Sequence, residues 1–166
     1  LASNPPLHGA PRPVAACTSD YPPMRKHLLE IVLVEDDEVE IEAITRALKN
    51  LRIAHDLTVF RSGAGAIQSL RQQRQHLQHP YPFLMLLDLN IPDVRGLDLL
   101  CRLRQDSLLR AALVFVLTNS DSEEDKLAAY NLQVAGYLLK SNLGPRYERL
   151  TALIHAYHQV VEFPNR

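Results

Sequence analysis

The sequence predicts an α/β domain in which five parallel strands form one sheet that is covered by helices on both faces. From residue 28 onward, short apolar runs alternate five times with longer segments whose apolar residues recur every three or four positions. The short runs are typical of strands buried on both faces, and the longer segments are typical of amphipathic helices. Because neighbouring parallel strands need right-handed crossover connections, this alternation favours a parallel sheet between two helical layers.

Each expected strand is a short run rich in Val, Ile, Leu or Phe. The five runs are residues 28–34, 57–60, 83–89, 112–118 and 136–139. The run at 83–89 gives the clearest prediction, because it is almost wholly apolar and the turn at 90–93 stops it. The run at 57–60 gives the least clear strand prediction.

Each expected helix is marked by apolar residues at helical spacing. The first, at 37–51, carries Ile41, Ile44, Ala47, Leu48 and Leu51. The second carries Ile67 and Leu70 and extends to Gln75. The third carries Leu97, Leu100, Leu103 and Leu108 or Leu109. The fourth spans 121–131, and the fifth spans 147–161 with Leu150, Leu153, Ile154, Tyr157 and Val161 facing inward.

The composition fits one folded domain. The chain has 166 residues, of which 46% are hydrophobic, and its 18 basic and 19 acidic side chains nearly cancel. This balance provides no overall field to draw the protein onto nucleic acid or an anionic membrane, so we expect neither as a partner. No apolar run approaches the ~20 residues of a membrane span. The two cysteines lie far apart, which favours a reducing, cytoplasmic location.

Residues 1–27 differ in character from the rest, because they hold six of the eleven prolines. We interpret them as a disordered tail and place the folded domain at 28–163. The chain begins at Leu1, and Met24 stands shortly before the first expected strand. Part of this tail is therefore a candidate for added or upstream sequence.

Polar side chains follow four of the expected strands. They are Glu35, Asp36 and Asp37 after the first, Asp88 and Asn90 at the end of the third, Thr118 in the fourth and Lys140 after the fifth. In the flavodoxin-like strand order 2-1-3-4-5, ligands gather at the carboxyl ends of the first and third strands. The acidic run and Asp88 would then lie side by side.

Carboxylates this close need a cation between them. Mg²⁺ is a hard cation that binds carboxylate, carbonyl and water oxygens and keeps positions open for phosphate. Lys140 would add positive charge, and the Thr118 hydroxyl could bond to a phosphoryl oxygen. The sequence therefore predicts a Mg²⁺ site suited to phosphoryl chemistry.

Four motifs in this order and spacing strongly resemble those of response-regulator receiver domains of two-component signalling. They are Ile-Val-Leu-Val-Glu-Asp-Asp at 31–37, Leu-Leu-Asp-Leu-Asn-Ile-Pro at 86–92 with Gly96, Val-Leu-Thr at 116–118 and Gly-Tyr-Leu-Leu-Lys at 136–140. The resemblance implies that Asp88 accepts a phosphoryl group from the phosphohistidine of a sensor histidine kinase. It also implies ligands for Mg²⁺: Glu35, Asp36, Asp88 and the backbone carbonyl of Asn90.

The same resemblance assigns the switch. Thr118 and Lys140 would contact the phosphoryl group, and Tyr137 would turn inward as Thr118 moves toward that group. Glu35 stands where aspartate is commoner, and its extra methylene suggests metal contact through water. Ser141 replaces the proline usual after the lysine, which leaves the isomer of the Lys140–Ser141 peptide open.

A narrower resemblance points to the small regulators that partner bacterial phytochromes. It rests on Thr-Asn-Ser-Asp-Ser-Glu-Glu-Asp at 118–125, Ala129-Tyr130 and Lys140-Ser141. It implies a phytochrome-type kinase as partner and a homodimer formed through the fourth helix, fifth strand and fifth helix.

Only about one helix follows the fifth strand. We therefore expect a stand-alone phosphoacceptor protein, not an enzyme, which signals through protein contacts.

Three alternatives compete with this interpretation. A haloacid-dehalogenase-like phosphatase would need a second aspartate two residues after Asp88, where Asn90 stands. A flavodoxin-like cofactor module would need a phosphate loop where the acidic run 35–37 would repel phosphate. A receiver fold that acts without phosphorylation stays open, because the sequence cannot show that the residues are used.

Overall fold

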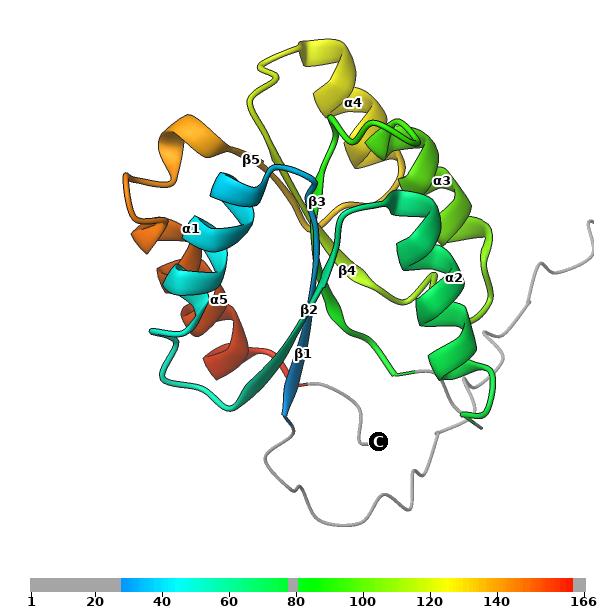
Figure 1. Ribbon diagram of the computed structural model, residues 1–166, viewed down its shortest axis with the longest axis horizontal. Helices are drawn as coiled ribbons and strands as arrows, with labels where there is room; N and C mark the ends of the chain where they lie inside the picture. The colour runs from blue at the N-terminus through cyan, green and yellow to red at the C-terminus, as the bar shows by residue number, and fades with distance from the viewer. Residues whose placement is uncertain (1–27, 78–80, 163–166) are drawn as a thin grey trace, which may run out of the picture.

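The computed structural model describes residues 28–77 and 81–162, and within them strands and helices alternate as predicted (Figure 1). The strands are β1 (Leu29–Val34), β2 (His55–Phe60), β3 (Leu84–Asp88), β4 (Leu113–Thr118) and β5 (Gly136–Leu139). The helices are α1 (Glu38–Leu48), α2 (Gly63–Arg74), α3 (Gly96–Gln105), α4 (Glu123–Asn131) and α5 (Glu148–Val160). A short 3₁₀ turn, η1 (Lys140–Asn142), follows β5. The tail predicted at 1–27 lies outside the described residues.

The five strands form one parallel sheet in the order β2-β1-β3-β4-β5, which confirms the predicted fold class. The register brings the carboxyl ends of the central strands together. Val34 pairs with Leu87, Asp88 with Leu117, and Thr118 with Leu139. Residues that follow these pairs therefore share one edge of the sheet, at the top of Figure 1.

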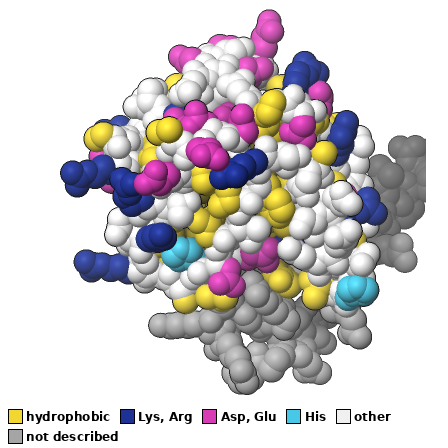
Figure 2. All heavy atoms as spheres, in the orientation of Figure 1, with side chains coloured by type: hydrophobic (Ala, Val, Ile, Leu, Met, Phe, Trp, Pro, Cys, Tyr) yellow, Lys and Arg dark blue, Asp and Glu magenta, His cyan; other side chains and the backbone are white. Residues whose placement is uncertain are grey.

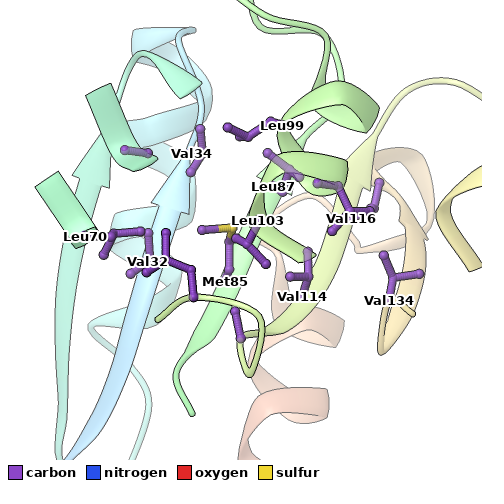
Figure 3. Close-up of a cluster of buried hydrophobic side chains, with 14 of the residues drawn as sticks. Val32, Val34, Leu70, Met85, Leu87, Leu99, Leu103, Val114, Val116 and Val134 are labelled. Atoms are coloured by element: carbon purple, nitrogen blue, oxygen red, sulfur yellow. The ribbon is translucent and has the colours of Figure 1, made fainter. Parts of the chain in front are cut away.

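Apolar side chains leave alternate positions of each central strand toward opposite faces. On one face, Val32, Met85 and Val114 pack with residues of α2, α3 and α4 (Figure 3). On the other face, Ile31, Leu86 and Phe115 pack with residues of α1 and α5. Burial on both faces explains why these strands read as continuous apolar runs. In the described part of the chain, no helix is both long and apolar enough to cross a membrane.

The structure corrects the predicted end of the third helix. We expected Leu108 or Leu109 to belong to it, but α3 ends at Gln105. The Asp106 carboxylate accepts a hydrogen bond from the Leu108 amide (2.9 Å), which favours a turn over another helical residue. Leu109 is fully buried in this turn. Leu109 is therefore apolar because it packs in the core, not because it lies on the apolar face of the third helix.

Candidate functional site

Buried polar side chains concentrate at the carboxyl edge of the sheet. Among the described residues, five polar or charged side chains are buried, and four lie at this edge: Glu35, Asp88, Thr118 and Lys140. Burying charged groups is costly unless they are paired. Their concentration at one place makes this edge the candidate site. Figure 2, which has the orientation of Figure 1, shows several acidic side chains in its upper half, where this edge of the sheet lies.

Lys140 joins the two acidic strand ends. Its Nζ donates hydrogen bonds to Glu35 Oε2 (2.7 Å) and Asp88 Oδ2 (3.0 Å). Burial raises the pKa of the Glu35 carboxyl, although the Lys140 ammonium opposes this shift. Burial alone would lower the pKa of Lys140, but its bonds to Glu35 and Asp88 outweigh burial and raise it. The ammonium thus remains charged and holds the two carboxylates together.

The donor atoms fit Mg²⁺. The Lys140 ammonium pairs with the carboxylates of Glu35 and Asp88, and Asp36, half-buried, adds a third carboxylate next to Glu35 in the chain, so this edge keeps negative charge that a divalent cation would offset. Among the residues described, no three acidic, cysteine or histidine side chains already converge as a metal cluster. Mg²⁺ usually keeps several waters and needs only one or two carboxylates. The set therefore suits a hydrated ion.

Backbone contacts orient the neighbours of the acidic cluster. Asp88 Oδ1 accepts a hydrogen bond from the Asn90 amide (3.0 Å), which fixes the second carboxylate oxygen and the loop after β3. Asp37 begins α1 and accepts from the Val39 and Glu40 amides, so it faces the helix end as its position suggested. The peptide between Lys140 and Ser141 is trans.

Thr118 and Tyr137 both contact the loop after β4. Thr118 Oγ1 accepts from the Ser120 amide (3.1 Å), and the Tyr137 hydroxyl donates to the Ser120 carbonyl (3.0 Å). The Ser120 hydroxyl in turn donates to Asp125 Oδ2 (2.7 Å) at the start of α4. One loop residue therefore links the two predicted switch residues to α4. The inward turn of Tyr137 stays a prediction.

Two residues near Lys140 were missed. Glu40 Oε2 lies 3.9 Å from Lys140 Nζ and also accepts a hydrogen bond from the Tyr147 hydroxyl. Glu40 lies in the first turn of α1, directly after the acidic run 35–37, so its position offered a signal. Tyr147 offered none, because it is 107 residues from Glu40 and only the fold brings them together.

Asp93 is a third residue that sequence reasoning did not single out. It lies in the loop between Asn90 and α3, and it accepts hydrogen bonds from the Ser62 hydroxyl (2.8 Å) and from the Gly63 and Ala64 amides (3.1 and 2.9 Å). These bonds cap α2 from across the sheet edge. The backbone bonds from Ala64 and Gly63 and the Ser62 hydroxyl lower the pKa of Asp93 from 3.8 to about 2.

The Asp93→Asn variant is expected to have a free energy of unfolding at pH 7 that is lower by about 1 kcal/mol, because one amide oxygen cannot replace both accepting oxygens of the carboxylate. Because the folded pKa lies below the unfolded value, Asp93 stabilises the fold above about pH 4, and this contribution disappears as the pH falls toward 2. The difference between wild type and variant should narrow by roughly half at pH 3. Urea unfolding at both pH values measures it. A difference that is equally large at pH 3 would contradict the role of the charge.

Comparison with known proteins identifies the family. The family described as response regulator receiver domain matches residues 31–154. The chain belongs to this family. The receiver is 36% identical to response regulator Rcp1 of Synechocystis sp. over 135 residues, which cover 81% of the chain and 92% of Rcp1.

Solved structures extend this similarity. The phosphorylated cyanobacterial phytochrome response regulator RcpA matches with a TM-score of 0.68 and 29% identity, over 84% of this chain and all of RcpA. The Mn²⁺-bound form of Rcp1 matches with a TM-score of 0.66 and 33% identity, over 82% of this chain and 99% of the other. The predicted family and the narrower resemblance to phytochrome response regulators are both confirmed.

Proposed function

We propose that this receiver accepts a phosphoryl group on Asp88 from the phosphohistidine of a sensor histidine kinase. The observation that carries the proposal is the buried bridge from Lys140 to Asp88 and Glu35. This bridge places a fixed positive charge beside one carboxylate that ends a central strand. The similarity to phytochrome response regulators supports a phytochrome-type kinase as the donor.

In the transfer step, an Asp88 carboxylate oxygen attacks phosphorus. The phosphorus–nitrogen bond of the donor breaks, and the imidazole leaves with the bonding pair and then takes up a proton. The products are an acyl phosphate on Asp88 and a free histidine. The Asn90 amide holds one Asp88 oxygen and Lys140 holds the other, so the carboxylate is oriented before the donor arrives.

Two side chains would stabilise the transferred group. Lys140 offsets the negative charge of the phosphoryl oxygens, which is the main demand of phosphoryl transfer. Thr118 accepts in its bond with Ser120, so its own proton can be donated to a phosphoryl oxygen. Mg²⁺, held by Asp36, Asp88, the Asn90 carbonyl and Glu35 through water, would neutralise further charge on these oxygens.

The output surface would be α4, β5 and α5. Leu127 and Tyr130 lie one turn apart on α4 with exposed fractions of 65% and 56%. Exposed apolar side chains at this spacing favour a protein contact. When Thr118 turns toward the phosphoryl group, it would give up the Ser120 amide and free the loop that holds Tyr137 and α4. We therefore expect signalling by protein contact, including homodimer formation through this surface.

Intact mass tests the proposal. Wild type incubated with phosphoramidate and Mg²⁺ is expected to gain one phosphoryl group, whereas Asp88→Asn, or wild type with EDTA, gains none. Asp56→Asn serves as the control, because Asp56 is an exposed carboxylate near the amino end of the edge strand β2. It should gain the group as wild type does.

The same samples on a sizing column report whether phosphorylation changes the assembly. No gain in wild type, or an equal gain in Asp88→Asn, would contradict Asp88 as the acceptor. No gain in wild type would favour a receiver that acts through contacts without phosphorylation, whereas an equal gain in Asp88→Asn would place the phosphoryl group on another residue.

A further inference from the structure

A third carboxylate lies within ion-pair distance of Lys140 but beyond hydrogen-bonding distance. Glu40 Oε2, on the first turn of α1, lies 3.9 Å from Lys140 Nζ, whereas Glu35 and Asp88 lie at 2.7 and 3.0 Å. The side chain of Glu40 is 30% exposed and that of Lys140 only 6%. A carboxylate this close to a buried ammonium would ordinarily move into hydrogen-bonding distance, because charge-assisted bonds are strong. Something must hold Glu40 back.

Tyr147 provides the restraint. Its hydroxyl donates to the same oxygen of Glu40 that faces Lys140. Burial and the Glu40 carboxylate both raise the pKa of Tyr147, so the phenol remains a donor at neutral pH. The bond therefore anchors Glu40 from the side of α5.

Tyr147 is itself held firmly. It is buried, it packs in the core layer between the sheet and helices α1 and α5, and its backbone has φ 56° and ψ 26°. This left-handed conformation is uncommon for a bulky residue and persists only where surrounding contacts fix it. The Tyr147 amide donates to the Gly144 carbonyl (3.1 Å), and Gly144 also has a positive φ of 82°. The loop after η1 thus places the phenol against α1.

We propose that Tyr147 is a positioning residue that keeps Glu40 from forming a hydrogen bond with Lys140. The Lys140 ammonium then stays bonded to Asp88 and can contact a phosphoryl group there. The inference rests on the proposed function, since the role of Lys140 is to assist phosphoryl transfer to Asp88. Without the Tyr147 hydroxyl, Glu40 would draw Lys140 toward α1 and share its three protons among three carboxylates. The ammonium would then bond less closely to Asp88 and would turn less readily to an incoming phosphoryl group.

Rates of labelling by phosphoramidate with Mg²⁺ test this role. Tyr147→Phe is expected to lower the initial rate roughly three- to tenfold, the range that the free energy of one hydrogen bond gives. Adding Glu40→Gln to Tyr147→Phe removes the competing charge and should restore the rate to within about twofold of wild type. Tyr157→Phe is the control, because it removes a phenol hydroxyl from α5 ten residues after Tyr147. It should label at the wild-type rate.

The rescue separates positioning from a general loss of structure. A rate loss in Tyr147→Phe that Glu40→Gln fails to reverse would overturn the proposal, as would a Tyr147→Phe protein that labels at the wild-type rate.

A second readout needs no phosphorylation. NMR signals of the Lys140 ε-methylene in the unphosphorylated protein should shift in Tyr147→Phe and return toward wild type in the double variant. Unshifted signals would overturn the proposed role of Tyr147. If wild type gains no phosphoryl group but the signals shift and return, the proposed function fails while the positioning by Tyr147 stands.

Discussion

Lys140→Met is expected to destabilise the unphosphorylated protein by about 3–5 kcal/mol at neutral pH without divalent cations. The side chains of Glu35, Asp88 and Lys140 are 2%, 8% and 6% exposed. Methionine fills most of the space of lysine but leaves two buried carboxylates without their ammonium. The cost of such uncompensated charges exceeds the stability that the intact bridge provides. Urea unfolding in EDTA measures the loss.

Divalent cations and acid should both restore stability to this variant. Mg²⁺ would become the main positive partner of the carboxylates, so it should raise the unfolding midpoint of Lys140→Met more than that of wild type. Burial already raises the pKa of Glu35, and losing the ammonium would raise it further. A group with a raised folded pKa stabilises the fold below its unfolded pKa, near 4.5, and loses this contribution as the pH rises. The difference from wild type should therefore narrow toward pH 4.5.

Lys126→Met provides the matched control. Lys126 pairs with Asp121 and Glu123 at the protein surface, and both acidic partners are largely exposed. Surface pairs of this kind contribute little, so the unfolding midpoint should change little and should not depend on Mg²⁺. Equal losses in the two lysine variants would show that the buried bridge is no more important than a surface pair.

The sequence could predict the sheet and the edge where the site lies for a simple physical reason. Strands buried on both faces, such as β3, are continuous apolar runs, and parallel connections bring their carboxyl ends to one edge. Residues at the carboxyl ends of the strands, such as Glu35 after β1, Asp88 at the end of β3 and Lys140 after β5, are then brought to the same edge by the fold. In the structure, Lys140 donates hydrogen bonds to both Glu35 and Asp88 at this edge.

Other parts of the site depended on contacts that the sequence does not encode locally. The carboxylates were expected to need a cation between them, with Mg²⁺ as the candidate and Lys140 as a further positive charge, and in the structure the Lys140 ammonium itself bridges Glu35 and Asp88. The predicted Mg²⁺ would thus join an existing ion pair. Tyr147 reaches Glu40 only because a loop with two left-handed residues turns the phenol toward α1. No periodicity or motif in the sequence predicts such a loop.

Gly96→Ala is expected to destabilise the fold by about 3 kcal/mol, the upper end of the usual cost of overpacking. A Cβ at this position would lie 2.5 Å from the Leu89 Cα and 2.7 Å from the Asp88 carbonyl oxygen. Both are backbone atoms, so no side-chain rotation can relieve the contact. The Gly96 amide also donates to the Leu89 carbonyl (3.0 Å), which seats the start of α3 directly on the end of β3. The methyl group must therefore push α3 away from the strand that carries Asp88.

Gly65→Ala separates this steric effect from the general effect of adding a methyl group to a helix. At Gly65, which lies in the first turn of α2, the nearest atoms to an added Cβ are Ser62 Oγ and Cβ at 3.4 and 3.6 Å, which is ordinary contact. This substitution should stabilise the protein by about 0.5–1 kcal/mol, because glycine is costly in a helix. Urea unfolding of the two variants should thus give free-energy changes of opposite sign.

Because the added methyl group at Gly96 would displace the backbone of Asp88 itself, the Gly96→Ala protein that remains folded should also be labelled more slowly by phosphoramidate. A Gly96→Ala variant as stable and as reactive as Gly65→Ala would mean that α3 can shift without moving Asp88.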